Sequence, residues 1–103
     1  MERIEKLKEF LQVSHEDSFI KHAIALEYIN LGDDKTARDL FEELLNREPG
    51  YTGSYYHLAK LLERIGQMKD AIEVYEKGMK ETKRTGDNHA YNELRAAYEE
   101  LTF

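Results

Sequence analysis

The sequence repeats itself at an interval of 34 residues, and this repeat constrains the fold more than any other feature. Shifting the chain by this interval places small residues on small residues, aromatic on aromatic and turn residues on turn residues. The aligned pairs are Ile24 with Leu58, Ala25 with Ala59, Gly32 with Gly66, Lys35 with Lys69, Ala37 with Ala71, Phe41 with Tyr75 and Glu42 with Glu76. Such a period indicates an array of helical repeats, each packed on its neighbours.

The apolar residues recur at steps of three and four, which is the spacing of amphipathic helices. Gly32 and Gly66 mark helix ends, and Pro49, the only proline, separates two helix pairs. Helices joined by such short loops should be antiparallel. The six predicted helices cover residues 2–12, 18–31, 34–47, 52–65, 68–84 and 88–101.

Polar residues in front of the predicted helices are candidates for helix caps, because their side chains can accept hydrogen bonds from the first backbone amides. The candidates are Ser14, Asp17 or Ser18 for the second helix, Asp33 or Asp34 for the third and Thr52 for the fourth.

The sequence resembles the tetratricopeptide repeat family over residues 18–84. The first copy of the signature reads Ile24, Ala25, Tyr28, Gly32, Ala37, Phe41 and Pro49, and the second reads Tyr55, Leu58, Ala59, Leu62, Gly66, Ala71 and Tyr75. Three positions depart from the pattern. Lys21 stands where the first copy would have a bulky residue, Leu44 replaces a usual small residue, and Lys83 replaces the second proline.

The resemblance implies an all-α, right-handed α-solenoid of antiparallel helix pairs. We expect one domain over residues 1–103, with repeats at 18–50 and 51–84. Residues 1–17 would supply an N-terminal capping helix and linker, and residues 85–103 a C-terminal capping helix. Small residues, including Gly78, would let helices cross closely while aromatic rings fill the space between crossings.

Composition favours a soluble, cytoplasmic protein. Hydrophobic residues make up 41% of the chain and charged residues 35%, there is no cysteine, and the charged start lacks a signal-peptide pattern. The net charge of −6 argues against nucleic acid or an anionic membrane as a partner. A short basic cluster, Lys77 to Arg84, falls at a predicted helix end, where the helix dipole favours cations.

No catalytic, cofactor or metal site is predicted. The four histidines, His15, His22, His57 and His89, include no pair at helical spacing, whereas zinc ligands usually come in such sets or with cysteine. Adjacent glutamates point to different sides of a helix and suit solvated surface better than acid–base chemistry. We therefore expect a protein that is not an enzyme.

The resemblance implies a concave groove, formed by the first helix of each pair, that receives a peptide or helix of a partner protein. The groove residues are expected to be Phe19, His22, Leu26 and Asn30, then Tyr56, His57, Lys60 and Glu63, then Asn92 and Ala96. The competing interpretation is that Phe19 and Leu26 belong partly to the core. His22 and Leu26 stand where some family members use lysine and asparagine to hold a terminal carboxylate, which argues against that ligand.

An alternative function is self-association, for example as a homodimer, without a separate ligand. Tyr98, Leu101 and Phe103 could lie on an outer face of the last helix, where a missing partner helix would pack. The competing interpretation is that this helix covers its own core and Phe103 is a frayed end.

Overall fold

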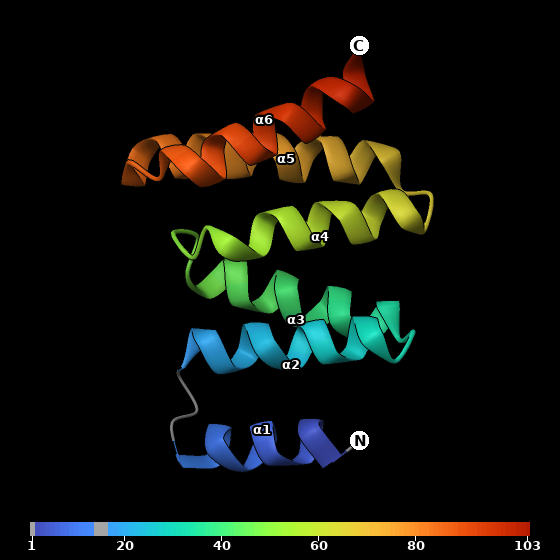
Figure 1. The fold of residues 1–103 in the computed structure, drawn as a ribbon, viewed down its shortest axis with the longest axis vertical. Helices are drawn as coiled ribbons and strands as arrows, with labels where there is room; N and C mark the ends of the chain where they lie inside the picture. The colour runs from blue at the N-terminus through green and yellow to red at the C-terminus, as the bar shows by residue number, and fades with distance from the viewer. Residues whose placement is uncertain (1, 14–16) are drawn as a thin grey trace. The chain divides into compact units, whose positions relative to one another are not determined.

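The computed structural model describes residues 2–13 and 17–103, and within them the chain is entirely helical apart from its turns. The helices are α1 (Glu2–Val13), α2 (Ser18–Asn30), α3 (Asp34–Arg47), α4 (Gly53–Arg64), α5 (Met68–Thr85) and α6 (Asn88–Thr102) (Figure 1). The predicted all-α fold of six helices is confirmed, with bounds that differ by at most one residue. The predicted capping residue Ser14 lies outside the described part of the chain. So does His15, one of the four histidines considered as metal ligands.

The chain forms two compact units, one up to Glu48 and one from Pro49 to Phe103. The boundary coincides with the proline that separates the helix pairs in the sequence. The finer division into one domain with two repeats and two caps stays a prediction.

In the first unit, α2 packs against both α1 and α3. Ile4 anchors α1, and Arg3 Nε lies 2.6 Å from Glu27 Oε1 of α2. Burying apolar side chains supplies most of the stability of such a unit. Its other buried apolar residues are Ile24, Ala25, Ala37, Phe41, Leu44 and Leu45.

In the second unit, α5 packs against both α4 and α6, and α4 also contacts α6. Tyr55 Oη donates a hydrogen bond to the Pro49 carbonyl at 2.6 Å, and burial raises the pKa of Tyr55 to about 12. The buried apolar residues are Tyr55, Leu58, Ala59, Leu61, Leu62, Ala71, Tyr75, Leu94 and Ala97.

Gly78 sets how closely α5 approaches its neighbours. A Cβ atom at this position would lie 2.8 Å from Tyr55 Cβ on α4 and 2.9 Å from Leu94 Cδ1 on α6. Real Cβ atoms essentially never make contacts that short. The three helices therefore meet at a point where only glycine fits.

Two of the predicted helix caps are confirmed, and one is wrong. Asp17 accepts a hydrogen bond from Ile20 N, and Asp33 accepts one from Thr36 N, both at 3.2 Å. The prediction that Thr52 caps α4 is wrong, because its side chain makes no capping bond. Thr52 Oγ1 instead donates to Asp87 Oδ2 at 2.8 Å, and so links the start of α4 to the residue that caps α6.

Candidate partner-binding surfaces

The predicted groove residues of the second unit lie along one side of α4. Tyr56, His57, Lys60 and Glu63 are all partly exposed, and their spacing places them on neighbouring turns. Lys60 Nζ lies 3.6 Å from Glu63 Oε2 and 5.8 Å from the centroid of the Tyr56 ring. A cation over an aromatic ring is an attractive arrangement, so these contacts hold the three side chains in fixed relative positions.

A buried tyrosine of α5 forms a hydrogen bond with one residue of this row. Tyr75 of α5 is fully buried, and its hydroxyl donates a hydrogen bond to the Glu63 carboxylate. Burial raises the pKa of Tyr75, and the hydrogen bond and negative charge of Glu63 raise it further. Tyr75 therefore stays a neutral donor and fixes the carboxylate that pairs with Lys60.

His57 lies beside Tyr56 in the α4 row. Its ring meets the Tyr56 ring edge-on, with centroids 5.9 Å apart. Burial lowers the pKa of His57 below 6.5, and the charge of Glu93 on α6 opposes this effect without overcoming it. The imidazole is therefore mainly neutral at pH 7.

This shift makes the stability of the protein depend on pH. Because the folded state holds the pKa of His57 below 6.5, the unfolded chain takes up the proton first as the pH falls. The contribution of His57 to the free energy of unfolding is fully present above about pH 6.5 and declines below it. We expect urea denaturation between about pH 7 and pH 5 to show a steeper loss of stability in the wild type than in His57→Gln. Parallel curves for the two proteins would contradict this assignment.

α6 completes the surface of the second unit. It runs parallel to α4 in Figure 1 and contacts it. Asn92 and Ala96 are exposed, and helical spacing places Ala96 between Glu93 and Glu100 on one side of the helix. The charges of Glu93 and Glu100 act on His57 of α4 and on Tyr75 of α5, respectively. The helices that carry the predicted α4 and α6 residues therefore pack against each other.

In the first unit, the predicted residues form a stripe along α2. Phe19 is 68% exposed and Asn30 is exposed, whereas Leu26 and His22 are partly buried. The His22 ring meets the buried Phe41 ring of α3 edge-on, with centroids 5.6 Å apart. His22 is thus positioned by the core, while Phe19 offers its ring to solvent. A role of this stripe in binding stays a prediction.

The three residues predicted for self-association differ in their surroundings. Tyr98 is partly buried and donates a hydrogen bond to Glu76 Oε2 of α5 at 2.9 Å, which raises the pKa of its phenol. Leu101 is partly buried, and Phe103 is 95% exposed. Tyr98 is therefore tied to its own unit, and Phe103 has the most exposed large apolar side chain in the described chain.

Sequence reasoning missed two features. One is the Tyr75–Glu63 bond, which joins different helices and has no local signal. The other is a cavity in the first unit between the first turn of α2 and the last turn of α3. The departures at Lys21 and Leu44 were the available signal for the cavity, because both residues line it.

Within residues 2–13 and 17–103, no group of three His, Asp or Glu side chains is arranged to hold a metal ion. No helix of this part combines the length and apolar character needed to cross a membrane.

Residues 29–98 match a family model described as tetratricopeptide repeat, and this match spans more than half of the chain. The protein belongs to the tetratricopeptide repeat family. The family was predicted from the 34-residue period, and the match confirms it. A tetratricopeptide-repeat-containing protein of Pseudomonas aeruginosa is 22% identical to this repeat protein over 91 residues, which cover 88% of this chain and 87% of that one.

Solved structures resemble this tetratricopeptide repeat protein closely. A tetratricopeptide repeat domain protein from Salinibacter ruber, solved by NMR, is 36% identical, with a TM-score of 0.80, and the match covers 82% of this chain and 86% of that one. The TPR2B domain of yeast Sti1, in a complex with pHsp70, has a TM-score of 0.86 at 13% identity over 96% and 79% of the two chains. The Yersinia enterocolitica type III secretion translocator chaperone SycD has a TM-score of 0.84 at 11% identity over 96% and 69%. At these low identities the last two show the fold alone.

Proposed function

We propose that this tetratricopeptide repeat protein is a non-enzymatic adaptor that binds a peptide segment or helix of another protein. The binding residues are the α2 stripe in the first unit and the α4–α6 surface in the second. The observation that carries the proposal is the ordered row of Tyr56, Lys60 and Glu63 beside α6. A cytoplasmic location and a protein partner, rather than nucleic acid or membrane, are part of the proposal.

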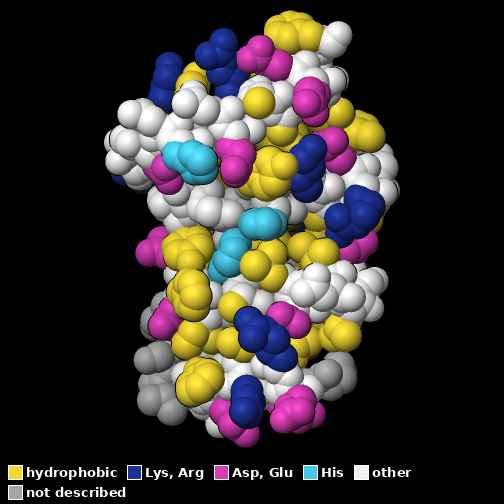
Figure 2. Space-filling view, viewed as in Figure 1, with side chains coloured by type: hydrophobic (Ala, Val, Ile, Leu, Met, Phe, Trp, Pro, Cys, Tyr) yellow, Lys and Arg dark blue, Asp and Glu magenta, His cyan; other side chains and the backbone are white. Residues whose placement is uncertain are grey.

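The chemistry of the α4–α6 surface suits protein recognition. Figure 2 shows hydrophobic, charged and histidine side chains intermixed over the part of the view that α4 and α6 occupy in Figure 1. Partly exposed tyrosines give large contact areas and hydrogen bonds, and they are frequent among the residues that dominate binding energy. Because Lys60 and Tyr56 already contact each other in the free protein, little side-chain ordering remains to oppose binding.

The structural neighbours support an interaction role of this general kind. The Sti1 domain was solved in a complex with pHsp70, and SycD is described as a chaperone of secretion translocators. The ligand proposed here is not a terminal carboxylate held by lysine and asparagine, since His22 and Leu26 occupy those positions. An internal peptide segment or a helix fits the mixed surface better.

The test compares affinity capture from an extract of the source organism by two baits. One bait is the wild type, and the other carries Leu26→Ala, Tyr56→Ala and Lys60→Ala. We expect a protein captured by the wild type to bind the triple variant at least about tenfold more weakly, because anchor residues each contribute more than about 1 kcal/mol. Helicity and unfolding should change much less than binding.

Lys77→Ala is the matched control, because Lys77 is exposed on α5, outside the proposed surface. The control should bind like the wild type. Equal affinity of wild type and triple variant, with helicity intact, would refute the proposed surface.

Self-association through the last helix is the second candidate, favoured by the exposed ring of Phe103. It predicts a mass that rises with concentration in analytical ultracentrifugation and falls to the monomer value in Tyr98→Glu with Leu101→Glu. A monomer mass at all concentrations would exclude this candidate. If the affinity capture recovers only copies of the same chain, self-association becomes the favoured function in place of the adaptor function.

A further inference from the structure

The α4–α6 surface of the second unit carries more negative than positive charge. On α4, Lys60 Nζ lies 3.6 Å from Glu63 Oε2, so these two opposite charges largely balance each other. On α6, Glu93 and Glu100 are both exposed. In the part of the chain that the structure describes, neither of these two glutamates forms an ion pair with a lysine or an arginine. The surface therefore has an excess of negative charge.

Glu93 approaches a histidine one turn earlier on α6. His89 Nε2 lies 3.8 Å from Glu93 Oε2, and the His89 side chain is 92% exposed. An imidazole is not a permanent cation, and pairs that are exposed to solvent contribute little energy. This contact therefore does not prevent Glu93 from binding a cation of a partner.

The two α6 carboxylates lie on the side of the helix that is turned away from α5. Tyr98 Oη donates a hydrogen bond to Glu76 Oε2 of α5 at 2.9 Å, and so marks the side of α6 that faces α5. Glu100 comes two residues after Tyr98, and an α-helix has 3.6 residues per turn, so Glu100 lies on nearly the opposite side. Glu93 is seven residues before Glu100 and shares its side.

Both carboxylates are close enough to the α4 row for their charges to be felt there. Burial lowers the pKa of His57 on α4, and the negative charge of Glu93 works against that lowering. Burial and the hydrogen bond to Glu63 raise the pKa of Tyr75, and the negative charge of Glu100 raises it further. Because such effects weaken with distance, Glu93 and Glu100 belong to the same surface as the α4 row.

We propose that the partner segment bound at the α4–α6 surface is basic, with lysine or arginine side chains placed against Glu93 and Glu100. This inference rests on the proposed function and adds the chemical class of the partner. Carboxylates accept charge-assisted hydrogen bonds from both cations, and arginine can donate two in parallel. The long apolar stems of these side chains can pack on the partly exposed Tyr56 ring and on the exposed Ala96.

The charge of the whole chain acts in the same direction. A net charge of −6 attracts a basic segment during its approach and repels an acidic one. An acidic segment would also place its carboxylates beside Glu93 and Glu100, where like charges repel each other. The surface therefore distinguishes partners by the sign of their charge as well as by shape.

The experiment selects peptides from a random library displayed on phage, with the full chain as bait. We expect the retained peptides to be enriched in lysine and arginine relative to the unselected library. Enrichment in aspartate and glutamate, or retained peptides without a charge bias, would overturn the basic partner and leave the adaptor function in place. Retention no higher than that of beads without protein would overturn both.

Charge variants then separate this surface from the net charge of the chain. Fluorescence polarisation with one selected basic peptide compares the wild type with the double variant Glu93→Gln and Glu100→Gln. We expect the double variant to bind about tenfold more weakly, which is about 1.4 kcal/mol, with its helicity intact. Added salt should weaken binding by the wild type more than binding by the variant, because the variant has lost the charges that salt screens.

The matched control is the double variant Glu43→Gln and Glu73→Gln. It removes the same amount of charge from exposed positions of α3 and α5, outside the α4–α6 surface, and should bind like the wild type. Equal weakening by the two double variants would assign the effect to net charge and overturn the proposal. Unchanged binding by the variant without Glu93 and Glu100 would overturn it as well.

Discussion

Replacing Phe41 with alanine should lower the free energy of unfolding by about 3–5 kcal/mol. Phe41 is fully buried and supports the His22 ring from α3. Truncation removes the transfer free energy of the ring and leaves a cavity that the helices cannot close completely. Urea denaturation followed by circular dichroism measures the loss.

Phe19→Ala is the matched control, because it removes the same ring from a site that is 68% exposed. The free energy of unfolding of this variant should stay within about 0.5 kcal/mol of that of the wild type. Similar losses for the two variants would mean that Phe41 is not the core residue described here.

Replacing Gly78 with alanine should also destabilise the protein, although alanine is the better helix former. Alanine gains about 1 kcal/mol of helix propensity over glycine. The new methyl group, however, would press on Tyr55 Cβ and Leu94 Cδ1 at 2.8 and 2.9 Å, and overpacking of this kind costs about 1–3 kcal/mol. Because Tyr55 Cβ cannot rotate away, we expect the clash to exceed the propensity gain, with a lower thermal midpoint as the readout.

Gly53→Ala provides the comparison for Gly78. Gly53 begins α4, and a Cβ atom there meets nothing within 4 Å. Alanine at this position should be neutral or slightly stabilising. A more stable Gly78→Ala protein would show that α5 can move away from α4 and α6 at little cost.

The sequence predicted the helices well because their signals are local and occur twice. Gly32 and Gly66 both adopt positive φ, at +81° and +84°, and each ends a helix where the period places it. Asp33 caps α3 through Thr36, three residues away. Such contacts depend only on neighbours along the chain, so spacing is sufficient to predict them.

Thr52 shows why other contacts could not be predicted. Its backbone is already helical, at φ −65° and ψ −26°, whereas a capping residue usually has an extended conformation. Its hydroxyl bonds to Asp87, 35 residues away. Asp87 comes within hydrogen-bond distance of Thr52 only after α4, α5 and α6 have packed. No local sequence pattern can therefore predict this bond.

The candidate surfaces were predicted in part. Helical spacing placed Phe19 and Leu26 on one stripe, and Tyr56 and Lys60 on another. Spacing within one helix could not reveal that Tyr75 of α5 holds Glu63 of α4. The side-chain order of the α4 row depends on this contact between helices.

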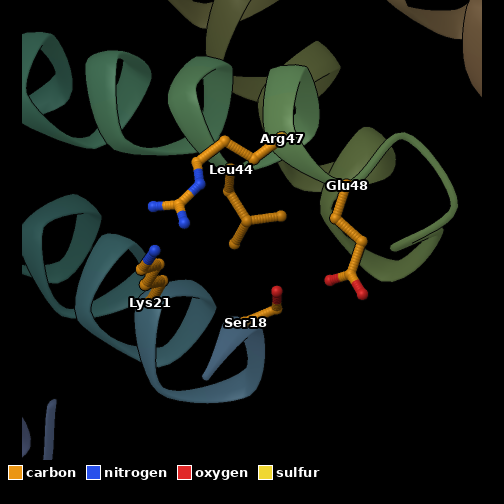
Figure 3. Close-up of a pocket in the computed structure, with 5 residues that line it drawn as sticks. All are labelled: Ser18, Lys21, Leu44, Arg47 and Glu48. Atoms are coloured by element: carbon orange, nitrogen blue, oxygen red, sulfur yellow. The ribbon is translucent and has the colours of Figure 1, made fainter. Parts of the chain in front are cut away.

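The pairing of Tyr55 with Gly78 has a consequence for protein engineering. A longer array built by duplicating residues 51–84 would carry this matched pair in every copy, with the bulky ring always opposite a residue that has no side chain. An array built from residues 18–50 would instead multiply Lys21 and Leu44, which stand in place of Tyr55 and Gly78 and line the cavity of the first unit (Figure 3). The two modules have the same helix pattern and differ by one residue in length, but only the later one carries the matched pair.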